Sequence, residues 1–177
     1  MTSSPASRFG GFAAGHFVVT ALCAPLLFCL PYFFDTAVTP LGWLWLMALY
    51  IPAGWSVSAL RNWERPSPKE GVKAILYPAL LAWGWALVGW LLFLASLAWP
   101  AVGTAGSFML LSTYFLAAPS FALMLAALQG EPTFAALALS PGWYGCMLLA
   151  GLLPPLLFFL GSLLPKRRLT KAENVIE

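Results

Sequence analysis

Long apolar runs separated by short polar connectors dominate the chain. Each of the five runs is continuously apolar, without alternation between apolar and polar positions. A helix needs about 20 apolar residues to cross the roughly 30 Å hydrocarbon core of a bilayer. Strands of a membrane barrel would instead alternate over segments of about ten residues. The pattern therefore predicts transmembrane helices over residues 11–34, 41–60, 72–99, 104–129 and 143–164.

The composition agrees with a membrane location. Hydrophobic residues make up 61% of the 177 residues, charged residues make up 8%, and the mean hydropathy is +0.84. A soluble domain carries about 25% charged residues. This difference excludes a water-soluble globule, a disordered chain and a nucleic-acid binder with a basic face. We expect an all-α integral membrane protein, a single domain over residues 1–177 that forms a bundle of four to five transmembrane helices.

The basic residues give conflicting information about topology. The loop 61–71 and the tail 165–177 hold most of the Lys and Arg, so both are expected in the cytoplasm. Three predicted spans separate them, however, and three crossings would place them on opposite sides. The segment 143–164 contains Pro154 and Pro155, and paired prolines disrupt a helix. Two alternatives follow: the last segment is broken or re-entrant at these prolines, or five full spans leave one basic end outside.

Tryptophan and intramembrane hydroxyl groups define a candidate ligand pocket. Trp83 and Trp90 lie in the middle of the third predicted span, seven residues apart and on one helix face. A buried indole needs a partner for its N–H group. These rings could form the aromatic wall of a pocket, or they could pack against lipid and neighbouring helices. Hydroxyl groups near Pro119 could line a small polar cavity or bond carbonyls that the proline leaves free. The candidate pocket residues are Trp83, Trp90, Ser112, Tyr114 and Ser120.

Small residues recur four positions apart in three of the predicted spans. Such stripes allow two helix backbones to approach closely in a membrane, where van der Waals packing drives association. The partner helix could belong to this chain or to another protein. The candidate packing residues are Gly11, Gly15, Ala118, Ala122, Ala126, Gly142, Cys146 and Ala150.

Titratable groups are nearly absent from the predicted spans. His16 is the one ionisable candidate within them apart from isolated cysteines, and the acidic residues lie at segment ends or in the loop and tail. Acid–base catalysis needs at least two convergent groups, and zinc needs three or four ligands. A haem would need an axial ligand pair. The sequence therefore predicts no catalytic residues, no metal site and no cofactor.

Three classes of function remain. The favoured class is a non-enzymatic subunit or accessory component of a membrane complex, with a membrane-protein partner or a second copy of the chain. The alternative is a small permease-like or binding protein for an apolar or aromatic molecule. The disfavoured third class is an enzyme acting on lipid. In every case the expected surroundings are the lipid bilayer, as a multi-pass protein of the bacterial cytoplasmic membrane, with no nucleic-acid partner.

Overall fold

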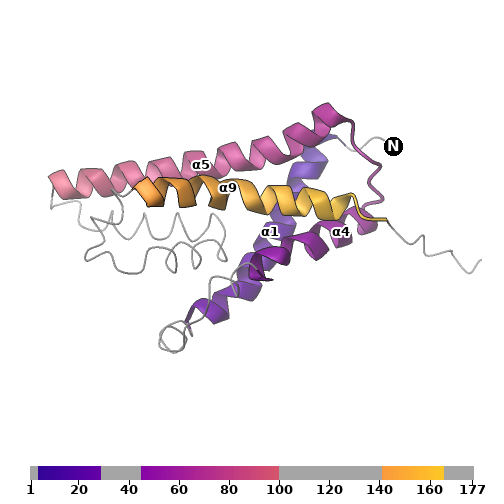
Figure 1. Cartoon of the computed structure of the whole chain (residues 1–177), viewed down its shortest axis with the longest axis horizontal. Coiled ribbons are helices and arrows are strands. Elements are labelled where there is room, and N and C mark those ends of the chain that lie inside the picture. Colours follow the sequence, from indigo (N-terminus) through magenta and orange to yellow (C-terminus); the bar gives the residue numbers. More distant parts are fainter. Residues whose placement is uncertain (1–3, 29–44, 100–140, 166–177) are drawn as a thin grey trace, which may run out of the picture.

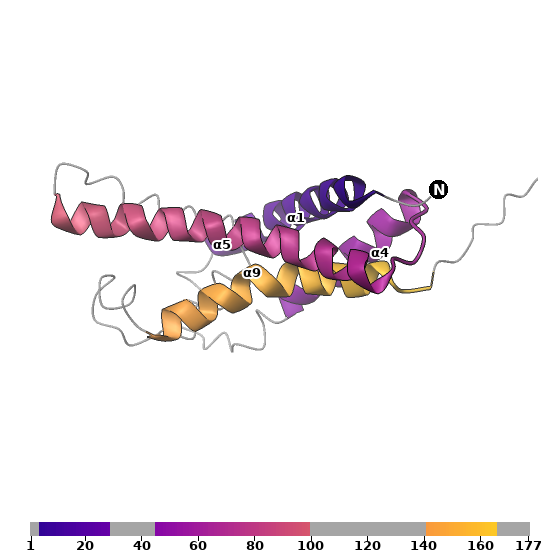
Figure 2. The ribbon, with the colours of Figure 1, turned by 90° about the horizontal axis from the view of Figure 1, so that it is seen from above.

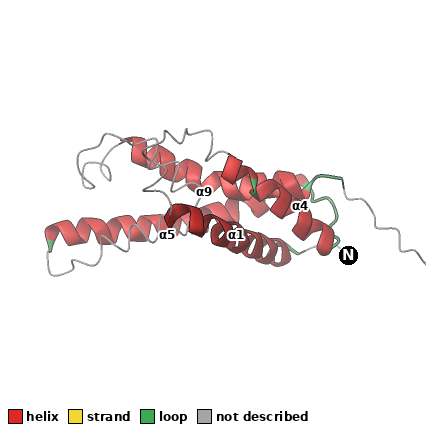
Figure 3. Ribbon diagram, turned by 90° about the horizontal axis from the view of Figure 1, so that it is seen from below, coloured by secondary structure: helices red, strands yellow, loops and turns green. Residues whose placement is uncertain are grey.

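The computed structural model describes residues 4–28, 45–99 and 141–165, and the regular elements in these ranges are all helices (Figure 1). Figure 3 shows the same residues coloured by secondary structure, with no strand among them. The all-α prediction is confirmed for this part of the chain, whereas the predicted span 104–129 lies outside it. The described helices are α1 (Pro5–Phe28), α4 (Tyr50–Leu60), α5 (Pro68–Ala98) and α9 (Pro141–Ser162).

Helix α5 begins four residues before the predicted span because its first turn is capped. The Ser67 hydroxyl accepts a hydrogen bond from the backbone N–H of Glu70 (3.4 Å), and the Glu70 carboxylate accepts one from the backbone N–H of Ser67 (2.9 Å). Pro68 occupies the first helical position, where its missing N–H costs nothing. This reciprocal capping box satisfies two otherwise unpaired donors. The loop before α5 is therefore shorter than predicted.

Helix α9 is continuous through Pro154 and Pro155. The alternative of a broken or re-entrant last segment is therefore wrong. Each proline removes the hydrogen bond to the carbonyl four positions earlier, at Ala150 and Gly151. Both prolines are buried, and α9 makes its most extensive contacts with α4 and α5. Neighbouring helices can support a proline-containing helix in this way, which the sequence of one segment does not reveal.

Helices α5 and α9 run antiparallel along each other, as the view from above shows (Figure 2). Near the start of α5, a Cβ atom at Gly71 would lie 2.8 Å from Cζ of Phe159, late in α9. Further along α5, the Trp90 ring packs edge-on against Tyr144, early in α9, with centroids 6.0 Å apart. The end of α9 therefore lies beside the start of α5. The chain leaves α5 and begins α9 at the same end of the molecule.

Helices α4 and α9 touch through their backbones. A Cβ atom at Gly54 of α4 would overlap the carbonyl oxygen of Phe158, and one at Gly161 of α9 would overlap the carbonyl oxygen of Ile51. Both glycines are buried. No side chain can be inserted at either position without separating the two helices. Neither glycine belongs to the predicted packing stripes.

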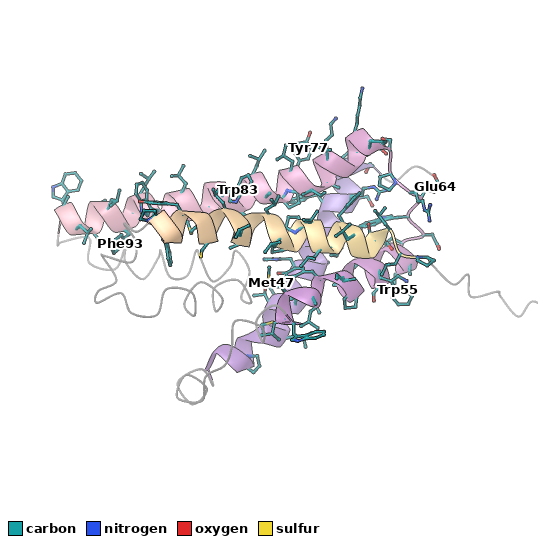
Figure 4. The ribbon with its side chains drawn as sticks, viewed as in Figure 1. Met47, Trp55, Glu64, Tyr77, Trp83 and Phe93 are labelled. Atoms are coloured by element: carbon teal, nitrogen blue, oxygen red, sulfur yellow. The ribbon has the colours of Figure 1, made fainter. Side chains whose placement is uncertain are left out.

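The buried core lies where α1, α4 and α9 meet. It includes Val19, Met47, Tyr50, Trp63 and Phe158, with Cys23 beside them. Figure 4 shows Met47 next to the crossing of α1 and α4. The core therefore lies towards one end of the long α5–α9 pair.

Much of the apolar surface lies outside this core. Helices α5 and α9 are both long and apolar enough to cross a membrane, and only 17% of the most apolar stretch of α5 is buried inside the chain. Exposed leucines follow α5 along its length, among them Leu80, Leu87 and Leu97. A core helix of a soluble protein would bury such residues. This surface is weak but consistent support for a membrane location.

The contact between α4 and α9 predicts that alanine is not tolerated at its glycines. Gly54→Ala or Gly161→Ala should lower the free energy of unfolding by about 2–3 kcal/mol, the cost of overpacking a tight contact. Gly145→Ala is the matched control, because a Cβ atom there meets nothing within 4 Å. Thermal unfolding of the purified variants in mild detergent measures the difference. Equal unfolding temperatures for the three variants would contradict the close crossing.

Candidate functional site

A cavity of about 590 Å³ lies between α1, α5 and α9. Helix α5 contributes one of its faces, on which residues recur at spacings of three and four. Helix α1 contributes its aromatic face, and α9 contributes the turn that contains its two prolines. The residues of the α5 wall that follow this spacing are Pro78, Leu81, Trp85 and Val88.

The wall of this cavity is almost entirely apolar. Among its lining residues, only His16 and Trp85 carry side-chain atoms that can form hydrogen bonds. The remainder are Phe, Leu, Val, Ala, Pro and Gly. Such a surface provides van der Waals contact and two positions for polar recognition. It contains no pair of titratable groups that could exchange a proton with a substrate.

His16 is held in place by two aromatic neighbours, Tyr50 and Phe12. Its Nδ1 atom lies 2.8 Å from the hydroxyl of Tyr50, whose side chain is completely buried. The Phe12 ring stacks on the imidazole with centroids 5.6 Å apart, and Phe12 in turn packs edge-on against Phe158 at 5.4 Å. These contacts fix the imidazole ring at the cavity wall. The fixed ring gives the cavity one polar position of defined geometry.

The structure brings two of the five predicted pocket residues together. Trp83 and Trp90 line a second cavity of about 260 Å³ between α5 and α9, on the opposite face of α5 from the larger one. The Trp83 indole N–H donates to the carbonyl of Leu148 (3.1 Å), and its ring covers Gly151. Figure 4 shows Trp83 on the side of α5 that faces α9. These indoles therefore hold α5 against α9. The other three, Ser112, Tyr114 and Ser120, lie outside the described residues.

The predicted packing residues have different surroundings. Gly11 lies against the ring of Trp63, and a Cβ atom at Gly15 would come within 2.6 Å of the Phe158 ring. In both places a glycine of α1 accommodates an aromatic ring from another part of the chain. In α9, Ala150 is buried, Cys146 is half-buried and Gly142 is exposed. The predicted residues Ala118, Ala122 and Ala126 lie outside the described ranges.

The start of α1 carries a buried arginine. The Arg8 side chain is 6% exposed, and its Nη2 atom donates to the carbonyl of Glu64 (2.7 Å). Its guanidinium carbon lies 5.3 Å from the centroid of the Trp63 ring, within the range of a cation–π interaction. These contacts attach α1 to the loop that precedes α5. The charge of Arg8 therefore sits at the end of the molecule where α9 also finishes.

Sequence reasoning missed the larger cavity and the role of Arg8. The spacing of three and four residues indicates that Pro78, Leu81, Trp85 and Val88 share one helix face. The predicted pocket residues Trp83 and Trp90 lie on the opposite face of α5, which contacts α9. What the sequence could not supply was the placement of α1 across that face.

The described residues contain no candidate metal site, and the comparisons with known proteins find no relative. Among the described residues, no group of three or more His, Cys, Asp or Glu side chains is close enough to hold a metal ion. No protein-family model matches the chain, and comparison with curated proteins and with solved structures also finds no match.

Proposed function

We propose that this chain is a multi-pass membrane protein that binds an apolar or aromatic small molecule in the cavity between α1, α5 and α9. The observation that carries the proposal is the cavity itself. Its volume of about 590 Å³ falls within the range of roughly 300–1,000 Å³ that is typical of ligand sites. An apolar wall with two hydrogen-bonding side chains is also typical of such sites. Binding, rather than catalysis, is the role that this wall supports.

Exposure of the apolar helices supports a location in the bilayer. Leucine side chains along α5 and α9 have no protein neighbours to cover them in the described structure, as at Leu91 and Leu149. In water, contiguous apolar surface of this kind drives aggregation, whereas lipid solvates it. A ligand dissolved in the membrane would then reach the cavity laterally. The bundle of four to five spans remains part of this proposal.

The antiparallel pair supports a cytoplasmic position for both basic segments. The loop before α5 and the end of α9 lie at one end of the molecule, where the Trp55 indole donates to the carbonyl of Pro165 (3.3 Å). Lys and Arg beside both segments favour the cytoplasmic side. The end of α5 and the start of α9 lie together at the other end of the pair.

A role as a subunit of a larger complex stays a prediction. The described helices expose apolar surface in several directions, and this surface fits lipid as well as a protein partner. The cavity distinguishes the two roles because a scaffold does not need one. The binding role is therefore the one we propose.

The topology predicts the same side for both basic segments. A cysteine introduced at Ser67 and a reporter fused after Glu177 should both be accessible from the cytoplasm, because both basic segments adjoin the same end of the α5–α9 pair. Labelling with a membrane-impermeant maleimide, before and after permeabilisation, measures the first position. Reporter activity measures the second. Opposite sides would contradict the arrangement.

Filling the cavity should weaken binding without unfolding the protein. Gly84 lines the cavity, and a Cβ atom there meets nothing within 4 Å. Gly84→Leu should weaken saturable binding of 1-bromonaphthalene by about tenfold, equivalent to about 1.4 kcal/mol, because the new side chain occupies ligand volume. Gly10→Leu is the control, since Gly10 has equal space in α1 but does not line the cavity.

Quenching of tryptophan fluorescence in lipid nanodiscs measures this binding. The parent and the Gly10→Leu variant should both give saturable quenching of equal affinity. Equal affinity in Gly84→Leu, or quenching in the parent that rises linearly without saturation, would refute the binding role.

A further inference from the structure

One end of the apolar cavity adjoins a narrow cleft that carries charge. Phe9 of α1 and Pro78 of α5 line both the cavity and the cleft. Arg8 and Lys73 also line the cleft, on the side of the loop that precedes α5. The small basic cleft therefore adjoins the apolar cavity at Phe9 and Pro78.

Arg8 is incompletely paired for a buried cation. Its side chain makes one hydrogen bond, to the carbonyl of Glu64, and faces the Trp63 ring. Its Nε atom is buried and has no hydrogen-bond partner among the described residues. A guanidinium has five N–H donors, and a charge removed from water is costly unless it is paired. An anion at the mouth of the cleft, where Lys73 is exposed, would add compensation.

Glu70 interacts electrostatically with Arg8 and Lys73, but it compensates only part of their charge. Glu70 lines the cleft, but one of its oxygens accepts the backbone N–H of Ser67 in the capping box of α5. No salt bridge links Glu70 to Arg8 or Lys73 in the described structure. With one acid and two basic groups, the cleft has a net positive charge. It is suited to an anionic group that approaches from the membrane surface.

The depth of the cavity matches one leaflet of a bilayer. Its α5 wall extends from Pro78 to Val88, and ten residues of helix span about 15 Å. Half of a hydrocarbon core of roughly 30 Å has the same depth. Lys73 lies about 7 Å further towards the surface at 1.5 Å per residue. Basic side chains therefore lie nearer the membrane surface and the apolar wall lies deeper. An amphiphile with an anionic head and a long apolar chain has its groups in the same order.

From this arrangement we infer that the cavity binds an anionic phospholipid, with its phosphate at Arg8 and Lys73 and one acyl chain against the α5 wall. The inference rests on the proposed binding role and specifies its ligand. A wholly apolar ligand would fill the cavity but leave the net positive charge of the cleft without an anionic partner. His16 and Trp85 lie deeper, at the level of the chain or its ester groups.

Competition between two lipids with the same chains tests the headgroup. The full-length protein is equilibrated with equal amounts of dioleoyl phosphatidylglycerol and dioleoyl phosphatidylcholine, and native mass spectrometry measures which lipid remains bound. The parent should retain phosphatidylglycerol preferentially. Lys73→Gln should reduce this preference about fivefold, the effect of one basic group near an anionic headgroup.

Lys69→Gln is the matched control. It removes the same charge one turn earlier in α5, where the side chain is exposed and does not line the cleft. The preference of Lys69→Gln should equal that of the parent. Arg8→Gln should reduce the preference as well, but Arg8 also attaches α1 to the loop, so the comparison of the two lysines is decisive.

Three results would overturn the inference, and they differ in what they imply. Equal reductions in Lys69→Gln and Lys73→Gln would indicate general surface electrostatics. Equal retention of the two lipids by the parent, with both lost from Gly84→Leu, would overturn the headgroup assignment and leave the binding role intact. Full retention of both lipids by Gly84→Leu would overturn the binding role together with the inference.

Discussion

The structure depends on the direct backbone contact between α4 and α9. At Gly54 and Gly161 the absence of a side chain lets each helix meet a carbonyl oxygen of the other. In a membrane, helices gain nothing from leaving water, so close packing is their main attraction. This contact fixes α9 on one side, and α5 packs on another. A helix supported in this way can remain continuous through Pro154 and Pro155.

Aromatic rings placed over glycines extend the same principle to the other helices. Trp63 lies over Gly11, Phe158 lies against Gly15, and the Trp83 ring covers Gly151. In each pair a flat, rigid side chain fills the space that a missing Cβ atom leaves. These contacts bind α1 and α5 to the rest of the bundle. The cavity remains where α1 crosses α5 and no ring fills the space between them.

The sequence predicted the helical class, but not the arrangement of the helices. Continuous apolar runs were sufficient to predict helices, and the capping box at Ser67 and Glu70 would have set the start of α5 correctly. The requirement that a buried indole find a partner is met by Trp83 and the carbonyl of Leu148. Gly54 and Gly161 could not be identified, because their role depends on where two helices cross and not on a repeat within either. The continuity of α9 and the cavity depend on neighbouring helices in the same way.

The central claim is that an amphiphile from the membrane occupies the space between α1 and the Pro78–Val88 face of α5. Photo-crosslinking with a phosphatidylglycerol that carries a diazirine in its acyl chain tests this claim most directly. After irradiation in vesicles, mass spectrometry of peptides locates the adducts on the full-length protein. The account predicts adducts concentrated at cavity-lining positions such as Ala13, Leu81 and Trp85. Adducts spread over the apolar surface in proportion to exposure, with Leu91 and Leu149 labelled as strongly, would contradict it.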